Sequence, residues 1–360
     1  MSTLNETILY VDLKKLEENF IFLKNKLNAN TKIIGVVKAF AYGHGDISIS
    51  KKLEDLGFNA LWVSDFEEGV SLRKAGVKTN IIVANPGFKS YDIIIKYQLD
   101  VVIYNQRLLD LYCLKNNKIN IHLKFNTGMN RYGFDYGELK LIVAKIQKNP
   151  HLNVLSICSH LAASYDRAKK EHTLKQINKF KLICKDLQRL INKKIDRHVL
   201  NSNGLLNFPE HQMECVRLGI GLYGLTKINR LKQISSLYSV ITQIRNLKKG
   251  DSVGYGKSYI SSNDMKIAII PLGYADGLNR NLGNNIGSVV VNNIKCNIIG
   301  EISMDSFAVD ITGVSAKEGD SVEIFGDKIP VAEVAKNLNT ISYEIFSTLN
   351  RRIKRVYSNS

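Results

Sequence analysis

The sequence IIGVVKAFAYGHG, residues 33–45, joins a short apolar run to a lysine, a tyrosine and two further glycines. The run Ile33–Val37 predicts a buried strand that ends at Lys38 and a glycine-rich bend. A lysine that is partly removed from water and close to other charges can act as a nucleophile on an aldehyde cofactor. The alternative is a lysine that simply leaves the strand for solvent. Tyr42 and the glycines after it favour the first interpretation, because they suit a phosphate-bearing ligand beside the lysine.

Short apolar runs recur after this strand and alternate with amphipathic stretches. Apolar residues at helical spacing predict a first helix over Leu13–Leu27. The predicted strands are Ile33–Val37, Ala60–Ser64, Asn80–Ala84, Val101–Tyr104, Ile119–Phe125, Val154–His160, Arg197–Ser202 and Cys215–Leu218. The predicted helices between them include Phe66–Ala75, Gln106–Lys115, Gly137–Gln147 and Thr173–Leu190. About eight strands alternating with helices indicate a (β/α)8 TIM barrel, with a doubly wound open sheet as the competing arrangement.

The candidate catalytic and ligand-binding residues lie at, or just after, the carboxyl ends of the predicted strands. They are Lys38 after the first strand, Lys124 and Arg131 at the fifth, His160 at the sixth, Asn201 and Ser202 at the seventh, and Arg217, Gly219 and Ile220 at the eighth. A barrel gathers its active site at this end, and the loops after its last two strands commonly hold a phosphate. We favour the barrel because an open sheet would not bring the first and eighth strands together.

After about residue 230 the pattern changes to short alternating runs broken by glycine. The predicted strands here are Ser239–Ile244, Lys266–Ile270, Ser288–Val291, Phe307–Ile311 and Ser321–Phe325, and two helical stretches follow at Val331–Leu338 and Ile341–Leu349. We therefore predict a barrel domain over residues 8–230 and a mostly β domain over residues 231–360. We also expect residues 1–12 to associate with the second domain.

Composition narrows the class of protein. The net charge of +17 is spread over the chain without a nucleic-acid-binding motif, so we expect attraction for anionic small molecules rather than for nucleic acid. The five cysteines are scattered and never in C-x-x-C spacing, which argues against a disulfide framework and a zinc site, and no metal is expected. The start Met1–Glu6 lacks the features of a signal peptide, and no apolar run approaches membrane-spanning length. We expect a cytoplasmic protein with no membrane partner.

Seven motifs resemble those of alanine racemases. Residues 36–45, VVKAFAYGHG, resemble the family's V-V-K-A-N-A-Y-G-H-G, with Phe40 in place of Asn. Residues 122–131, HLKFNTGMNR, are similar to H-L-K-x-D-T-G-M-G-R. The other matches are SHLA at 159–162, VRLGIGLYG at 216–224, VGYG at 253–256, GYADG at 273–277 and GEISMD at 300–305, where Glu301 replaces a common Arg. Their order and spacing argue against a chance match.

The resemblance implies pyridoxal 5′-phosphate (PLP) as the cofactor, bound covalently by Lys38. It further implies that Tyr42, Ser202, Gly219 and Ile220 hold the phosphate and that His160, Asn201 and Arg217 complete the cofactor site. Arg217 would face the pyridine nitrogen. Because a guanidinium donates hydrogen bonds and accepts none, it would disfavour a protonated ring and so favour simple racemisation over side reactions.

The same resemblance implies a two-base racemase that interconverts L- and D-alanine and supplies D-alanine for peptidoglycan. Tyr255 would be the second base, contributed to the site by the other subunit of a homodimer. Arg131, Tyr274, Met304 and Asp305 would lie near the substrate, with Lys124 possible as a carbamylated lysine beside Arg131. The alternatives are a same-fold racemase for serine or for several amino acids, and a non-catalytic PLP-binding protein. The remaining histidines are expected to be surface or structural residues: His122, His151, His172, His198 and His211.

Overall fold

The computed structural model describes residues 6–226 and 230–359. Their fold divides into two compact units: a barrel unit of residues 17–41 and 46–222, and a β unit made of the described residues of Met1–Leu16, Tyr42–Gly45 and Tyr223–Ser360. Met1–Asn5, on which the expectation about a signal peptide partly rests, lies outside the described residues, as do residues 227–229 beside the predicted domain boundary.

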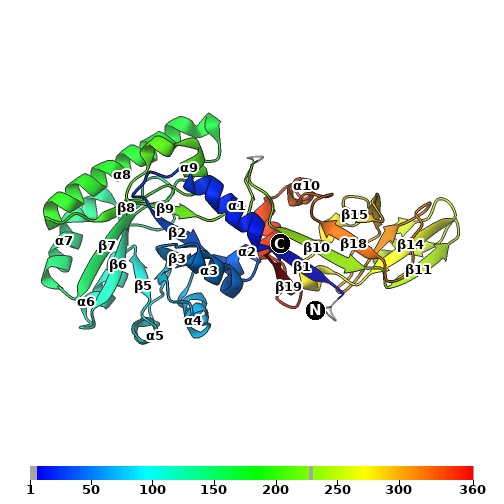
Figure 1. Ribbon diagram of the computed structural model, residues 1–360, viewed down its shortest axis with the longest axis horizontal. Helices are drawn as coiled ribbons and strands as arrows, with labels where there is room; N and C mark the ends of the chain where they lie inside the picture. The colour runs from blue at the N-terminus through cyan, green and yellow to red at the C-terminus, as the bar shows by residue number, and fades with distance from the viewer. Residues whose placement is uncertain (1–5, 227–229, 360) are drawn as a thin grey trace. The chain divides into compact units, whose positions relative to one another are not determined.

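Eight parallel strands form the barrel (Figure 1). They are β2 (Lys32–Val36), β3 (Ala60–Val63), β4 (Asn80–Val83), β5 (Asp100–Ile103), β6 (Ile119–Lys124), β7 (Leu152–Cys158), β8 (Asp196–His198) and β9 (Cys215–Leu218). Their spatial order is β8-β7-β6-β5-β4-β3-β2-β9, so the first predicted strand pairs with the eighth, and Ile34 lies opposite Arg217. Arg197 forms an ion pair with Glu214 at 2.8 Å, which links β8 to the start of β9 where the two ends of the barrel sheet adjoin. The predicted barrel is confirmed.

One helix, α1, precedes the barrel strands and the others follow them, each with its apolar side packed inward. They are α1 (Leu13–Lys24), α3 (Asp46–Asp55), α4 (Phe66–Lys74), α5 (Tyr91–Lys96), α6 (Gln106–Cys113), α7 (Leu139–Lys148), α8 (Lys170–Ile191) and α9 (Ser202–Asn207). In Figure 1, α6, α7 and α8 flank β6 and β7. The prediction of a strand over Arg197–Ser202 was wrong in its second half. Asn201 caps α9 by accepting the Gly204 N–H at 2.8 Å, and this local hydrogen bond starts a helix at Ser202.

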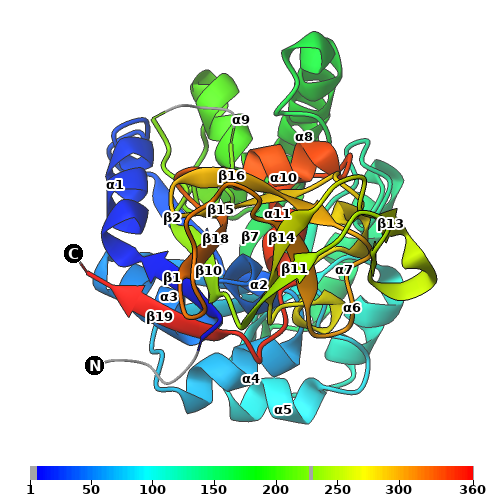
Figure 2. The same ribbon diagram turned by 90° about the vertical axis from the view of Figure 1, so that its right-hand side faces the viewer.

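The β unit is built on a nine-stranded sheet, part of which Figure 2 shows from its end. Its strands are β1 (Ile8–Asp12), β10 (Ser235–Val240), β11 (Gln243–Leu247), β14 (Met265–Ile270), β15 (Ser288–Val291), β16 (Ile294–Ile299), β17 (Phe307–Asp310), β18 (Ser321–Phe325) and β19 (Lys354–Ser358). A short hairpin of β12 (Ser252–Val253) and β13 (Tyr259–Ile260) and two helices, α10 (Val331–Asn337) and α11 (Ser342–Ser347), complete the unit. The strand β1 pairs with β10 and with β19, which joins the two ends of the chain in one sheet.

Two strand predictions for the β unit need correction. The single strand predicted over Ser239–Ile244 is in fact the end of β10 and the start of β11, which lie at different places in the sheet. The strand β16 was missed. It is the second arm of a hairpin whose two-residue turn, Asn292 and Asn293, has positive φ values of 47° and 69°, a conformation that asparagine tolerates.

The segment after Lys38 has an unusual backbone. It is α2 (Lys38–Tyr42), and Ala39, Phe40, Ala41 and Tyr42 all have φ between 51° and 55°, which makes it a left-handed turn. Each non-glycine residue in this region costs roughly 1–2 kcal/mol relative to the right-handed helix. Other contacts must therefore stabilise the turn.

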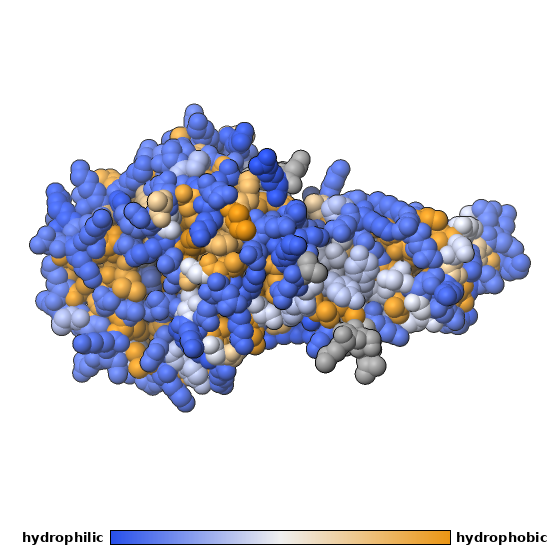
Figure 3. Space-filling view, viewed as in Figure 1, coloured by the Kyte–Doolittle hydropathy of each residue, from blue (hydrophilic) through white to orange (hydrophobic). Residues whose placement is uncertain are grey.

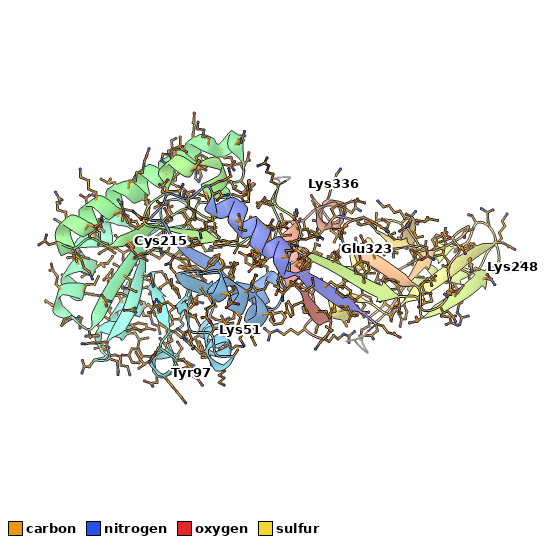
Figure 4. The ribbon with its side chains drawn as sticks, viewed as in Figure 1. Lys51, Tyr97, Cys215, Lys248, Glu323 and Lys336 are labelled. Carbon is orange, nitrogen blue, oxygen red and sulfur yellow. The ribbon has the colours of Figure 1, made fainter. Side chains whose placement is uncertain are left out.

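Polar side chains cover most of the face shown in Figure 3, with small hydrophobic clusters between them. All five cysteine thiols are free. Figure 4 shows Cys215 on its barrel strand, where burial raises the pKa of the thiol to about 12 and keeps it protonated. Within the described residues, no helix has both the length and the apolar character needed to cross a bilayer.

Candidate active site

Lys38 lies two residues beyond the end of β2, at the carboxyl end of the barrel. Its side chain is half-buried, and this burial, followed by the positive charge of Arg131, lowers the pKa of the Lys38 amine. A larger share of the amine is therefore neutral near neutral pH than for a lysine in water. A neutral amine is the form that attacks an aldehyde or accepts a proton.

Arg217 lies on β9, the strand that pairs with β2, and its guanidinium is buried. One terminal nitrogen donates to the His198 ring at Nδ1 and to the His198 carbonyl at 3.1 Å. The other donates to the Ser159 carbonyl at 2.7 Å and to the His160 ring at Nδ1, 3.3 Å away. Because a guanidinium only donates, both rings must accept at Nδ1 and carry their proton on Nε2. Burial, followed by the charge of Arg217, lowers the pKa of both histidines well below the usual value, so both rings are neutral.

The hydrogen bonds continue from His198 on β8 to the next two strands, β7 and β6. Its Nε2 donates to the Ser156 hydroxyl at 2.9 Å, which in turn donates to His122 Nδ1 at 2.6 Å. The His122 Nε2 lies 3.7 Å from an Asp100 carboxylate oxygen. His122 and His198 are buried, as a structural role would require, but sequence reasoning missed the contact of His198 with Arg217. The position of His198 at the end of β8 could have indicated this contact, because the other site residues also lie at carboxyl ends of strands.

The loops after β8 and β9 meet at Ser202. Its hydroxyl oxygen accepts the N–H groups of Gly219 and Gly221, at 3.0 and 3.2 Å. Since both acceptor positions are used, the hydroxyl hydrogen remains for donation to a ligand. A Cβ on Gly221 would come within 3.1 Å of the Ser202 side chain, which explains the glycine. Asn201 contributes by capping α9, and Ile220 is half-buried next to Gly219.

Lys124, Arg131 and His160 line one small cavity of about 10 Å³ beside Ser159. The Lys124 ammonium lies 5.6 Å from the centre of the Tyr132 ring. Burial is the main reason that the pKa of Lys124 falls to about 8, and the charges of Arg217, Arg131 and Lys38 lower it further. The barrel unit thus brings together the predicted residues Lys124, Arg131 and His160.

These residues fit a phosphate-bearing aldehyde such as PLP. Lys38 offers an amine of lowered pKa, Ser202 offers a hydroxyl donor, and Arg217 offers a buried cation that accepts no proton. With PLP present, Lys38 would hold its aldehyde carbon, Ser202 its phosphate and Arg217 its ring nitrogen.

The other predicted site residues belong to the β unit. Tyr42 packs there against the rings of Tyr223 and Tyr343, with centroids 5.0 and 6.4 Å away, and burial raises the pKa of its phenol well above the usual value. It therefore remains a hydrogen-bond donor, as a phosphate ligand must. Tyr255 is 70% exposed and begins a 3₁₀ turn after Gly254.

Tyr274, Met304 and Asp305 lie on two adjoining turns of the β unit. The Tyr274 N–H donates to the Ser303 carbonyl at 3.1 Å, and both Tyr274 (46% exposed) and Met304 (53% exposed) reach solvent in the single chain. Arg352 donates to Asp305 at 2.5 Å and to Asp276 at 2.6 Å. Sequence reasoning missed the contact of Arg352 with Asp305, although Arg352 lies in the conspicuous basic run at residues 351–355.

Comparison with known proteins identifies the family. The family models "Alanine racemase, N-terminal domain" and "Alanine racemase, C-terminal domain" match residues 11–227 and 234–357. An alanine racemase of Fusobacterium nucleatum is 36% identical over 362 residues, covering 97% of this chain and 99% of the relative. One of Helicobacter pylori (strain G27) is 35% identical over 373 residues, covering 96% and 97%.

Solved structures agree with the sequence relatives. The alanine racemase of Clostridium difficile 630 superposes with a TM-score of 0.93 at 29% identity, over 100% of this chain and 98% of that one. The alanine racemase of Bartonella henselae, solved with covalently bound pyridoxal phosphate, superposes with a TM-score of 0.90 at 29% identity, over 98% and 100%. The chain therefore belongs to the alanine racemase family.

Proposed function

We propose that Lys38 and Tyr255 are the two residues that move the proton when this enzyme interconverts L- and D-alanine. The reaction is PLP-dependent racemisation, and the chain is an isomerase. The observation that carries the proposal is the lowered pKa of the Lys38 amine. Lys38 follows β2, and β2 pairs with β9, the strand that carries Arg217. When bound, PLP supplies the electron sink that stabilises negative charge at the substrate Cα.

A second proton-transferring group is required because a lysine reaches only one face of Cα. The exposure of Tyr255 supports its use by another copy of the chain. We propose a homodimer in which Tyr255 of each subunit enters the site of the other, accompanied by Tyr274, Met304 and Asp305. His160 supports this arrangement, since its Nε2–H can donate to an incoming phenol while Nδ1 accepts from Arg217. The barrel unit would then bind PLP, and the β unit would carry the second base.

Arg217 should control which reaction follows proton removal. A glutamate in place of Arg217 could share a proton with the pyridine nitrogen, which a guanidinium cannot do. In Arg217→Glu we therefore expect racemisation to fall and the ratio of transamination to racemisation to rise by at least about tenfold. The ratio of D-alanine to pyruvate formed from L-alanine measures this. Arg197→Gln, on the neighbouring strand and outside the site, is the control. An unchanged ratio in Arg217→Glu would contradict the role.

Lys124 supports a further feature of the site. Its pKa of about 8 leaves part of the amine neutral at physiological pH, and a neutral amine is the form that reacts with CO₂. We propose that Lys124 is carbamylated and that the resulting anion holds Arg131 near the substrate carboxylate. The shared cavity of the two residues supports this pairing.

Substrate preference tests the proposed function most directly. We expect a higher kcat/KM for alanine than for serine or any basic amino acid in a panel of L-amino acids with added PLP, measured by detection of the D-isomer. A larger side chain must fit beside Arg131 and the Tyr274 and Met304 side chains of the other subunit, so alanine should be preferred by at least about tenfold. Higher activity on serine would make the enzyme a serine racemase. We further propose that it acts in the cytoplasm and supplies D-alanine for peptidoglycan.

A further inference from the structure

Glu68 connects the ends of two neighbouring barrel strands. It lies on α4, and one carboxylate oxygen accepts the Ala39 N–H at 2.5 Å, immediately after Lys38. The other oxygen accepts the Ser64 N–H at 2.7 Å, immediately after β3. One side chain thus binds the backbone that follows β2 and the backbone that follows β3, which are paired strands.

This use of Glu68 differs from ordinary helix capping. Asp65 is the N-cap of α4 and accepts the Glu68 N–H at 3.0 Å. In the usual capping box, the acidic residue three positions later returns to the backbone N–H of the cap residue. Here the Glu68 carboxylate binds Ser64, the residue before the cap, and uses its second oxygen for Ala39. The contact with Ala39 lies outside anything that α4 needs for its own stability.

The contact is made where the backbone most needs support. Ala39 is the first of the four consecutive non-glycine residues with positive φ after Lys38. The Ala41 N–H bonds to the Val37 carbonyl at 2.9 Å, which stabilises the turn from within. A hydrogen bond to an ionised acceptor is roughly twice as strong as one between neutral groups. Glu68 therefore stabilises the first residue of the left-handed turn, a conformation that costs free energy, through a hydrogen bond from outside the turn.

The charge of Glu68 also acts on Lys38. Burial and Arg131 lower the pKa of the Lys38 amine, and Glu68 is the negative group that raises it. Glu68 is half-buried, so water screens this interaction only in part. The carboxylate is thus close enough to affect Lys38 through its field as well as through the backbone.

We propose that Glu68 is a positioning residue for Lys38: its carboxylate holds the Ala39 amide and so keeps the left-handed turn and the lysine in the geometry needed for catalysis. The inference rests on the proposed role of Lys38 as the PLP-bearing base. Misplacing a catalytic group by about 1 Å can cost roughly a hundredfold in rate. Loss of Glu68 should therefore lower kcat more than it changes KM.

Two variants test this proposal against one control. Glu68→Ala removes both acceptors, and Glu68→Gln keeps the volume but removes the charge and one acceptor. Glu67→Gln is the control, because Glu67 is an exposed acid in the same first turn of α4. Hydrogen–deuterium exchange of the Ala39 amide is measured in the PLP-free protein, with residue-level fragmentation. Thermal unfolding shows whether each variant is folded, and Glu68→Gln carries the test if Glu68→Ala is not.

We expect Ala39 exchange to rise at least about tenfold in Glu68→Ala and less in Glu68→Gln, with the control unchanged. We expect kcat to fall about 10–100-fold in Glu68→Ala, with KM within about threefold of wild type. Unchanged Ala39 exchange, or faster exchange with wild-type kcat, would overturn the proposal. Borohydride reduction of the wild-type enzyme, followed by peptide mapping, tests the proposed role of Lys38 separately from the proposed role of Glu68. Label on a lysine other than Lys38 would refute the proposed function, whereas the Ala39 exchange result would stand independently.

Discussion

Lys38→Ala should lower racemisation by at least about 10³-fold and abolish covalent retention of PLP at the same time. One side chain is proposed both to bind the cofactor and to move a proton at Cα, so no remaining group replaces either action. The amine is suited to both tasks because burial and Arg131 lower its pKa. Racemisation is followed by polarimetry, and cofactor attachment by borohydride reduction and peptide mapping.

Lys32→Ala is the matched control for this variant. Lys32 begins the same strand, β2, and pairs with Asp196 at 2.7 Å on the surface. An exposed ion pair of this kind contributes about 0–1 kcal/mol to stability, so the control should retain nearly full activity. A Lys38→Ala protein that still carries reducible PLP on another lysine would show that Lys38 is not the attachment point.

Mixed dimers should give the second large effect. Each homodimer of Lys38→Ala or of Tyr255→Phe should be nearly inactive. A purified hybrid with one subunit of each should regain about half the wild-type activity per dimer. In a shared site both lesions fall into one of the two active sites and leave the other intact. Differently tagged subunits allow purification of the hybrid, and the activity per dimer is the measurement.

A second hybrid is the sharpest control, because the two possible arrangements predict opposite results. It pairs a wild-type subunit with a subunit that carries both Lys38→Ala and Tyr255→Phe. Shared sites make this dimer nearly inactive, since each site then contains one lesion. Sites within single chains make it half active, and the first hybrid inactive. Tyr259→Phe, four residues from Tyr255 in the same hairpin region, should keep activity within about twofold.

Much of the barrel could be predicted because its signals are local. Buried parallel strands are continuous apolar runs, so β9 (Cys215–Leu218) was predicted with its observed bounds and β2 differs by one residue at each end. The short helices α3 and α5 were missed. Ten- and six-residue helices present few turns of periodic pattern, and packing against the barrel supplies most of their stability.

The edges of the β unit were harder to predict. The strand β19 (Lys354–Ser358) lies in a basic run and pairs in parallel with β1, more than three hundred residues earlier in the chain. Pairing between such distant segments leaves no periodic trace in either one. Arg355 illustrates the consequence: its guanidinium is buried and donates to four backbone carbonyls, including that of Gly43 at 3.1 Å.

The sequence by itself determined the class of fold and the type of chemistry, because both depend on local order. An apolar run that ends in a lysine places that lysine at a strand end, whatever the rest of the chain does. Only the tertiary structure decided how these groups are tuned. The Arg217–His198–Ser156–His122 chain joins four separate strands or loops, and Glu68 reaches Ala39 from a different helix. Hydrogen bonds require donor and acceptor within about 3 Å, and residues far apart in sequence meet at that distance only after the barrel has closed.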